Sequence, residues 1–315
     1  MLINRRHIRT KVMQSVYAMH QSKSDDIEKQ EKFLFFSLDN IQDLYLTMLT
    51  ILTTILETER IFIEKSSQKH LATKAEKNPN KKFVNNLFIN FLTENESLKS
   101  AVEERKIDHW NLHSDYIQIL ITEIKNSKLY DNYMSNEIND FQEDKTFTLE
   151  IFEHIIVANE KIYEFLEDNR LTWIDDIPTV NTFIIKQLLQ IKSVKDNTFK
   201  VPKIYKDIED KEYVSNLFRK TVLNENEFEK EFIDKTPNWD ISRIAEIDTI
   251  ILKMAICEFL KFPSIPTNVT INEYLEIAKE YSTPKSSIFI NGILDNVVKE
   301  FSKNQRLMKT GRGLM

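Results

Sequence analysis

Residues 270–301 read TINEYLEIAKEYSTPKSSIFINGILDNVVKEF and indicate two successive helices. Thr270 and Glu273 have the spacing of a capping box, in which the hydroxyl and the carboxylate bond backbone amides at the start of a helix. Pro284 suits the first turn of the second helix. The first helix is expected to bury Ile271, Leu275 and Ala278. The apolar residues that the second helix can bury are Ile288, Ile293, Leu294, Val297 and Phe301.

The rest of the chain has the same helical character. Its 315 residues include only three glycines, and the first 78 residues contain neither Gly nor Pro. Apolar residues recur at three- and four-residue spacing, and no alternating run with turn dipeptides indicates a hairpin. We therefore expect an all-α protein of roughly two domains, built from helices with short connections.

The scarcity of glycine and cysteine excludes several classes of protein. A loop that cradles phosphate needs several glycines, and Gly292 is the first one, so P-loop enzymes and dinucleotide folds are excluded. Cys257 stands alone in an apolar run, which predicts a buried, unreactive thiol in a reducing compartment. No cofactor is expected.

The longest apolar run, Leu44 to Leu56, is interrupted by four threonines. It is shorter than the roughly 18–20 residues that span a bilayer, so it predicts a buried helix. The start, MLINRRHIRT, lacks the apolar stretch of a secretory signal, although a mitochondrial presequence would share its basic character. We expect a cytoplasmic protein without membrane association.

Charge is distributed unevenly along the chain. The net charge is −6, but residues 1–23 carry +5 and residues 302–315 carry +4, which leaves −15 between them. Attraction to a polyanion depends on local charge within about 8 Å at physiological salt, so basic ends can bind nucleic acid. The alternative is that both ends are solvated. Residues 302–315, which are polar and contain Gly311 and Gly313, are predicted to be a disordered tail.

The N-terminal helix is the strongest candidate for a binding surface. Arg6, Met13 and Tyr17 are spaced to lie on nearly one face, with Arg9 at its edge. Arginine pairs with phosphates and stacks on bases, and an exposed tyrosine also stacks, so this face suits single-stranded RNA. The alternative is an ordinary amphipathic helix with its arginines in water and Tyr17 in the core.

Catalytic and metal chemistry have weaker support. His109 and His113 have metal-ligand spacing on a helix, but no general base or cysteine ligand accompanies them, so surface histidines are the better interpretation. No metal is expected. Gly292 stands inside a helical segment, either because another backbone or a ligand approaches closely or because the helix kinks.

A weak internal repeat occurs at an offset of 66 residues. The matching pairs are Phe147 and Tyr213, Phe152 and Phe218, Asp168 and Asp234, Trp173 and Trp239, and Ile184-Ile185 and Ile250-Ile251. Each segment has the pattern of a helix, a connection with a tryptophan and a second helix, which favours a duplicated helical hairpin over chance.

Both ends of the chain resemble the NusB transcription antitermination family. The arginine-rich stretch Arg5–Arg9 continues to Gln14–Tyr17 like the family's first helix. Residues 250–260, IILKMAICEFL, are similar to its penultimate core helix. Further motifs follow in the family's order: Ile265-Pro266, Val269, Ile271–Glu273, Ala278-Lys279 and Phe289–Asp295.

The resemblance implies a NusB-like helical bundle that is not an enzyme and that acts in transcription antitermination. Such a protein would recognise boxA-like single-stranded RNA, chiefly in ribosomal transcripts, together with the ribosomal protein NusE in an RNA polymerase complex. Carried over to this chain, the RNA-binding residues are Arg5, Arg6, Arg9, Tyr17, Lys285, Phe289 and Asn291. There are two alternatives. The protein is a protein–protein scaffold that lost RNA binding, or it is an enzyme that uses the middle of the chain.

The chain departs from the family in three ways. It is about twice the usual length, Thr10 stands where a glutamate is frequent, and Tyr274 replaces a small residue after Asn-Glu. We therefore predict a discontinuous NusB-like body of residues 1–22 plus 213–301, an acidic helical insertion of residues 23–212 that contains the duplicated hairpin, and the tail 302–315.

Overall fold

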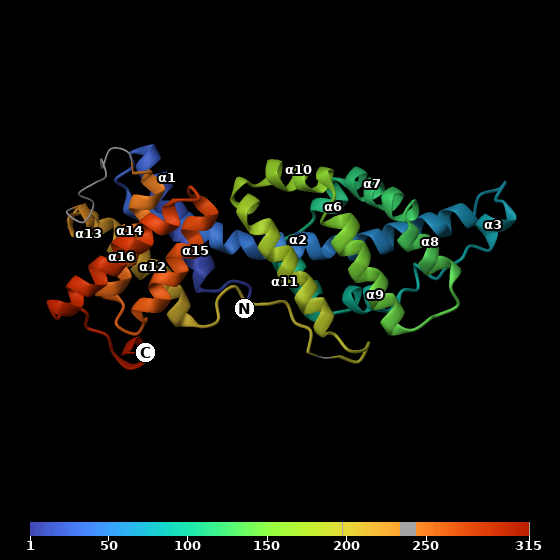
Figure 1. Ribbon diagram of the computed structural model, residues 1–315. Helices are drawn as coiled ribbons and strands as arrows, with labels where there is room; N and C mark the ends of the chain where they lie inside the picture. The colour runs from blue at the N-terminus through green and yellow to red at the C-terminus, as the bar shows by residue number, and fades with distance from the viewer. Residues whose placement is uncertain (197, 234–243, 315) are drawn as a thin grey trace. The chain divides into compact units, whose positions relative to one another are not determined.

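The computed structural model describes residues 1–196, 198–233 and 244–314 (Figure 1). Within these ranges the chain forms helices and connecting segments and no strand, so the predicted all-α fold is confirmed. The chain divides into two compact units. Unit 1 comprises Ile3–Leu38 and Ile204–Met315 together with Met1, and unit 2 comprises Asp39–Lys203 together with Leu2. The boundaries at 22/23 and 212/213 stay a prediction.

Unit 1 is a bundle of helices around one central helix (Figure 1). Its helices are α1 (Arg5–Ser22), the first turns of α2 (Ile27–Ser67), α12 (Ile208–Leu223), α13 (Glu225–Ile233), α14 (Glu246–Lys261), α15 (Thr267–Tyr281), α16 (Ser286–Lys303) and the short 3₁₀ turn η4 (Gly311–Leu314). Helix α14 packs against α1, α12, α13, α15 and α16.

Helix α14 is buried because its sequence is apolar on every side. All residues from Ile250 to Phe259 are buried, Cys257 among them as predicted. Burial raises the pKa of the Cys257 thiol to about 12, which fits the predicted unreactive group. Two charged side chains lie in this run. Lys253 pairs with Glu225 and Glu229 of α13, at 3.2 and 2.8 Å. The other, Glu258, is the centre of the site described below.

Several sequence predictions for residues 270–301 are wrong. Helix α15 begins at Thr267 after Pro266, so Thr270 and Glu273 lie inside it and form no capping box. Their side chains bond distant partners instead, Thr270 with Glu258 and Glu273 with Arg6. Tyr274 and Ile277 are buried on this helix where Leu275 is only half-buried.

The second predicted helix is α16, which begins at Ser286, two residues after Pro284. Ile293, Leu294, Val297 and Phe301 are buried as predicted. Ile288 is 76% exposed, because it lies in the first turn on the side away from the core formed by Ile290 and Leu294.

Unit 2 is also built only from helices over its described residues. They are the remainder of α2, α3 (Lys74–Lys77), α4 (Leu87–Thr93), α5 (Glu96–Arg105), α6 (His109–Leu112), α7 (Ser114–Lys125), α8 (Lys128–Ser135), α9 (Phe141–Ile151), the π-helix η1 (Phe152–Ile156), α10 (Glu160–Asn169), the 3₁₀ helix η2 (Leu171–Asp176) and α11 (Ile177–Gln190).

The apolar run Leu44–Leu56 lies in α2 and forms the centre of unit 2, as predicted for a buried helix. Two buried tryptophans fix this helix through its backbone. The Trp110 indole donates to the carbonyl of Thr47 at 2.7 Å, and the Trp173 indole donates to that of Asn40 at 2.8 Å. No helix among the described residues is long and apolar enough to cross a membrane.

The two histidines with metal-ligand spacing do not share a helix. His109 begins α6, and His113 lies at the junction of α6 and α7. His109 is half-buried rather than a surface residue, because its ring packs edge-on against Trp173 with 5.9 Å between centroids. Burial lowers its pKa. No group of three or more potential metal ligands occurs among the described residues.

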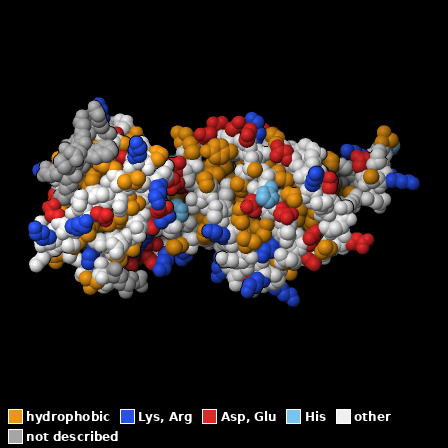
Figure 2. Space-filling view, in the orientation of Figure 1, with side chains coloured by type: hydrophobic (Ala, Val, Ile, Leu, Met, Phe, Trp, Pro, Cys, Tyr) orange, Lys and Arg blue, Asp and Glu red, His pale blue; other side chains and the backbone are white. Residues whose placement is uncertain are grey.

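Unit 2 carries most of the negative charge of the protein. Asp39–Lys203 contains 27 acidic residues and 20 Lys and Arg residues, whereas the rest of the chain contains 22 and 23. Figure 2 shows acidic side chains gathered over α10, where Glu160, Glu164 and Asp168 are exposed. A polyanion is therefore expected to bind unit 1 and not this surface.

The proposed duplication is only partly within the described residues. Residues 147–185 include the end of α9, η1, α10, η2 and most of α11, and residues 213–251 include most of α12, α13 and the start of α14. Asp234 and Trp239 lie outside the described residues, so the duplicated hairpin stays a prediction.

Gly292 allows a direct test of the packing of α16. A Cβ atom added there would meet nothing within 4 Å, so no other part of the described chain requires a glycine. Gly292→Ala is expected to raise the free energy of unfolding by about 1 kcal/mol, because alanine has the higher helix propensity. Urea denaturation measures this change, and a destabilised variant would show that the helix interior needs glycine for another reason.

Candidate nucleic-acid interface

The site begins at the N-terminal end of α1, where Asn4 caps the helix. Its side-chain oxygen accepts from the amides of Arg6 and His7 at 2.9 and 3.1 Å, and the His7 ring accepts from the Asn4 amide at 3.1 Å. Burial, followed by the charge of Arg6, lowers the pKa of His7, so the ring is neutral as this bond requires. The first turn contains no acidic residue. Arginines at this positive end of the helix dipole therefore need carboxylates from other helices.

Arg9 and Glu258 form a buried ion pair that joins α1 to α14. The guanidinium donates through Nε to Oε1 at 2.7 Å and through Nη2 to Oε2 at 3.1 Å, with side-chain exposures of 3% and 0%. Burial is the largest single influence on the pKa of Arg9 and lowers it, but the charge and hydrogen bonds of Glu258, together with Tyr213 and Tyr274, outweigh burial and raise the pKa. The Arg9 guanidinium is thus held charged inside the bundle.

Three hydroxyl groups complete the surroundings of Glu258. Thr270 and Tyr274 of α15 donate to its carboxylate at 2.9 and 3.0 Å, and Tyr213 of α12 donates as well. Burial raises the pKa of both tyrosines well above its ordinary value, so both remain donors. The Arg9 guanidinium lies 5.7 Å from the centre of the Tyr274 ring. Tyr274, the departure from the family pattern, therefore has a defined place in this network.

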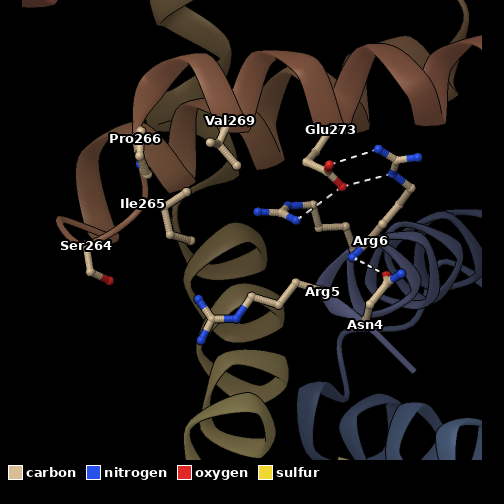
Figure 3. A pocket seen from close by; sticks show the side chains of 9 residues that line it. Asn4, Arg5, Arg6, Ser264, Ile265, Pro266, Val269 and Glu273 are labelled. Carbon is tan, nitrogen blue, oxygen red and sulfur yellow. Dashed lines mark hydrogen bonds and ion pairs between the residues drawn. The ribbon is translucent and has the colours of Figure 1, made fainter. Parts of the chain in front are cut away.

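The other two arginines pair with carboxylates nearer the surface. Arg6 donates to both oxygens of Glu273 at 2.9 and 2.8 Å, as Figure 3 shows. Arg5 extends apart from that pair and donates to Asp210 of α12 at 3.1 Å, with its guanidinium 5.0 Å from the centre of the Tyr213 ring. The side chains of Arg5 and Arg6 are 40% and 43% exposed.

These residues line an open groove of about 600 Å³ between α1 and the start of α15 (Figure 3). Its lining residues are Asn4, Arg5, Arg6, Arg9, Ser264, Ile265, Pro266, Val269 and Glu273. Val269 is 44% exposed, so one wall is apolar and accessible. The groove thus combines cationic donors with an apolar surface, the combination that accommodates phosphates and bases.

The structure brings only some of the predicted RNA-binding residues together. Arg5, Arg6 and Arg9 share the groove, although Arg9 is buried by its ion pair. Tyr17 is 38% exposed further along α1. Lys285 is exposed, and with Phe289 it lines a separate cavity of about 110 Å³. Asn291, in α16, is half-buried and lines neither.

Sequence reasoning missed the carboxylates that hold the arginines: Asp210, Glu258 and Glu273. One signal was available for Glu258. It is an acidic residue near the end of the apolar run IILKMAICEFL, and a buried carboxylate requires a cation and hydrogen-bond donors. Its partner Arg9 is 249 residues away in the sequence, so the pairing itself could not be inferred.

Fold and site together define an all-α bundle with an arginine-lined groove. A model of the NusB family matches residues 180–299. The chain therefore carries a NusB-family domain. The match includes α12 to α16 and begins in α11, whereas residues 1–22 lie outside it.

Individual relatives agree with this assignment. The chain is 42% identical over 105 residues to the transcription antitermination protein NusB of Salinibacter ruber, 38% over 109 residues to that of Chloroherpeton thalassium, and 43% over 93 residues to that of Natranaerobius thermophilus. These alignments cover 33%, 35% and 29% of the chain and 66%, 52% and 66% of the relatives. No solved structure matches the chain.

The family resemblance inferred from sequence is thus confirmed. The prediction that the protein is not an enzyme agrees with the name of these relatives, transcription antitermination protein.

The buried ion pair should dominate the stability of unit 1. Glu258→Gln removes the buried countercharge of Arg9 and leaves only the longer contact with Glu273 at 3.7 Å, so the free energy of unfolding is expected to fall by about 3–5 kcal/mol. Glu276→Gln, which removes an exposed pair with Lys279, is the matched control and should leave the free energy of unfolding nearly unchanged. Equal effects in urea denaturation would contradict the assigned role of Glu258.

Glu273 should make stability depend on acidic pH. The hydrogen bonds from Arg6 lower the pKa of Glu273, so the folded state binds this proton less readily than the unfolded state. The stabilisation is therefore present above the unfolded pKa of about 4.3 and is lost as the pH falls through the lower folded value. Between pH 6 and pH 3 the unmodified protein should lose more stability than Glu273→Gln. Glu280→Gln, an exposed site on the same helix, should not reduce the loss.

Proposed function

We propose that the protein binds single-stranded RNA in the groove of unit 1 and acts as a non-catalytic factor in transcription antitermination. The observation that carries the proposal is the pair Arg5 and Arg6, both exposed by about two fifths, beside an apolar wall in a chain with a NusB-family domain. The name of the relatives, transcription antitermination protein, supports the process.

The three arginines have different roles in this proposal. Arg9 fixes α1 to α14 and stays paired with Glu258. Arg5 and Arg6 are accessible, and each can exchange its carboxylate for a phosphate, which accepts the same donors. Bases would then lie on the apolar wall, where Pro266 and Val269 are accessible.

Other predicted residues would extend the binding surface beyond the groove. Tyr17 lies eight residues past Arg9, about 12 Å along α1, and its exposed ring can stack on a further base. We retain Lys285, Phe289 and Asn291 as a second contact region at the start of α16. Lys285 is exposed there and can reach a phosphate.

The particular RNA sequence and protein partners are proposed from the family resemblance. We propose a boxA-like element, chiefly in ribosomal transcripts, bound together with NusE as part of an RNA polymerase antitermination complex. The acidic surface of unit 2 is then free for a basic protein partner.

Binding of a boxA-like RNA oligonucleotide over a salt series, with and without NusE, tests the proposal. About four neutralised phosphates would give a log–log slope of roughly −3, at about −0.7 per phosphate for single strands. Arg5→Ala combined with Arg6→Ala should reduce the magnitude of the slope by about 1.4. Anisotropy of a labelled oligonucleotide gives both values.

Lys230→Ala combined with Lys299→Ala removes two exposed charges from α13 and α16 and serves as the charge-matched control, with little change expected. An unchanged slope in the arginine variant would remove the groove from the RNA surface. Binding of NusE without any RNA affinity would instead establish a protein–protein scaffold.

A further inference from the structure

The residues after α16 are attached to the bundle at several points along their length. We call Asn304–Leu314 the strap (Figure 1). It turns back at Gln305, whose φ is +54°, and the Arg306 amide donates to the Phe301 carbonyl at 2.8 Å. The Arg306 guanidinium donates to both oxygens of Glu231 in α13, at 2.9 and 2.7 Å. The first cation of the strap is therefore engaged within the protein.

Lys309 attaches the strap to the end of α14. Its ammonium donates to the carbonyls of Glu258 and Phe262 at 3.2 and 3.0 Å. Carbonyls in the last turn of a helix lack full intrahelical partners, and a lysine there satisfies them. Burial lowers the pKa of Lys309 to about 8, because the ammonium group is surrounded by protein instead of water.

The strap then packs directly on Pro263. The Thr310 amide donates to the Pro263 carbonyl at 3.0 Å. Gly313 is buried at the same point, and a Cβ atom on it would lie 1.9 Å from the Pro263 oxygen. That distance is far inside van der Waals contact, so only glycine fits unless the backbone moves.

Pro263 immediately precedes Ser264, Ile265 and Pro266, which line the groove opposite Arg5 and Arg6. These three residues lie in the short connection between α14 and α15. The connection has few bonds of its own among those described, one of them from the Ile265 amide to the Phe262 carbonyl at 3.2 Å. Its position thus depends on what packs behind it, and the strap packs there through Lys309, Thr310 and Gly313.

We infer that the strap is a positioning element for RNA binding, which holds the Ser264–Pro266 rim in place through Lys309 and Gly313. The inference rests on the proposed function, because it concerns the same groove. Lys309 acts through the rim and does not itself contact RNA. The basic charge of this segment therefore serves the structure of the groove and is not a free electrostatic arm.

Two variants test this inference by independent means. Gly313→Ala displaces the strap by a steric clash, and Lys309→Met removes the bonds to α14. Each should accelerate hydrogen exchange of the Ile265 amide about tenfold or more and weaken binding of the boxA-like oligonucleotide about tenfold. The salt slope should stay that of the unmodified protein, since no phosphate contact is lost. Lys309→Arg keeps the donors and should restore both properties.

Gly292→Ala is the matched glycine control and should leave the exchange at Ile265 unchanged. Unchanged exchange in the Gly313 and Lys309 variants would overturn the inference even if RNA binds. Faster exchange with unaltered RNA affinity would overturn it as well, because the rim would then not matter for binding. A slope reduced by about 0.7 in Lys309→Met would make Lys309 a phosphate contact and not a positioning residue. If the unmodified protein binds no RNA at any salt concentration, the proposed function fails and this inference with it.

Discussion

The ion pair between Arg9 and Glu258 is the interaction on which unit 1 depends. It joins the first helix of the chain to the central helix of the bundle across 249 residues of sequence. The buried pair is tolerated because both carboxylate oxygens of Glu258 have hydrogen-bond donors: Arg9 supplies two, and Thr270, Tyr213 and Tyr274 supply the rest. The same bonds orient α1, α12, α14 and α15, and so they define where the groove lies.

The three arginines of α1 differ in their exposure to solvent: Arg9 is buried and has a structural role, whereas Arg5 and Arg6 are accessible. The side-chain exposure is 3% for Arg9 and about 40% for Arg5 and Arg6. All three lie at the positive end of the helix dipole, an unfavourable place for cations, and each is compensated by a carboxylate from another helix. Packing thereby keeps arginines concentrated on one short stretch of surface, which the helix dipole alone would disfavour.

The all-α fold, the buried run Leu44–Leu56 and the arginine-rich first helix were predictable because composition and periodicity are local properties. The capping box at Thr270 and Glu273 was a wrong prediction for a physical reason. Helix α15 begins three residues earlier, at Thr267, so the amides that this capping box would use lie inside the helix, and the two side chains bond Glu258 and Arg6 instead. The burial of Arg9 could not be predicted either, because nothing near it in the sequence identifies Glu258 as its partner.

The pairing of each groove arginine with a carboxylate has a kinetic consequence. Because Asp210, Glu258 and Glu273 cancel the charge of the groove, its long-range field is weak, and acidic unit 2 adds no attraction. Electrostatic attraction therefore does little to increase the rate at which polyanions in general associate with the groove. A ligand binds only after it displaces a carboxylate from an arginine. Different RNA ligands should therefore be distinguished by how slowly they dissociate and not by how fast they associate.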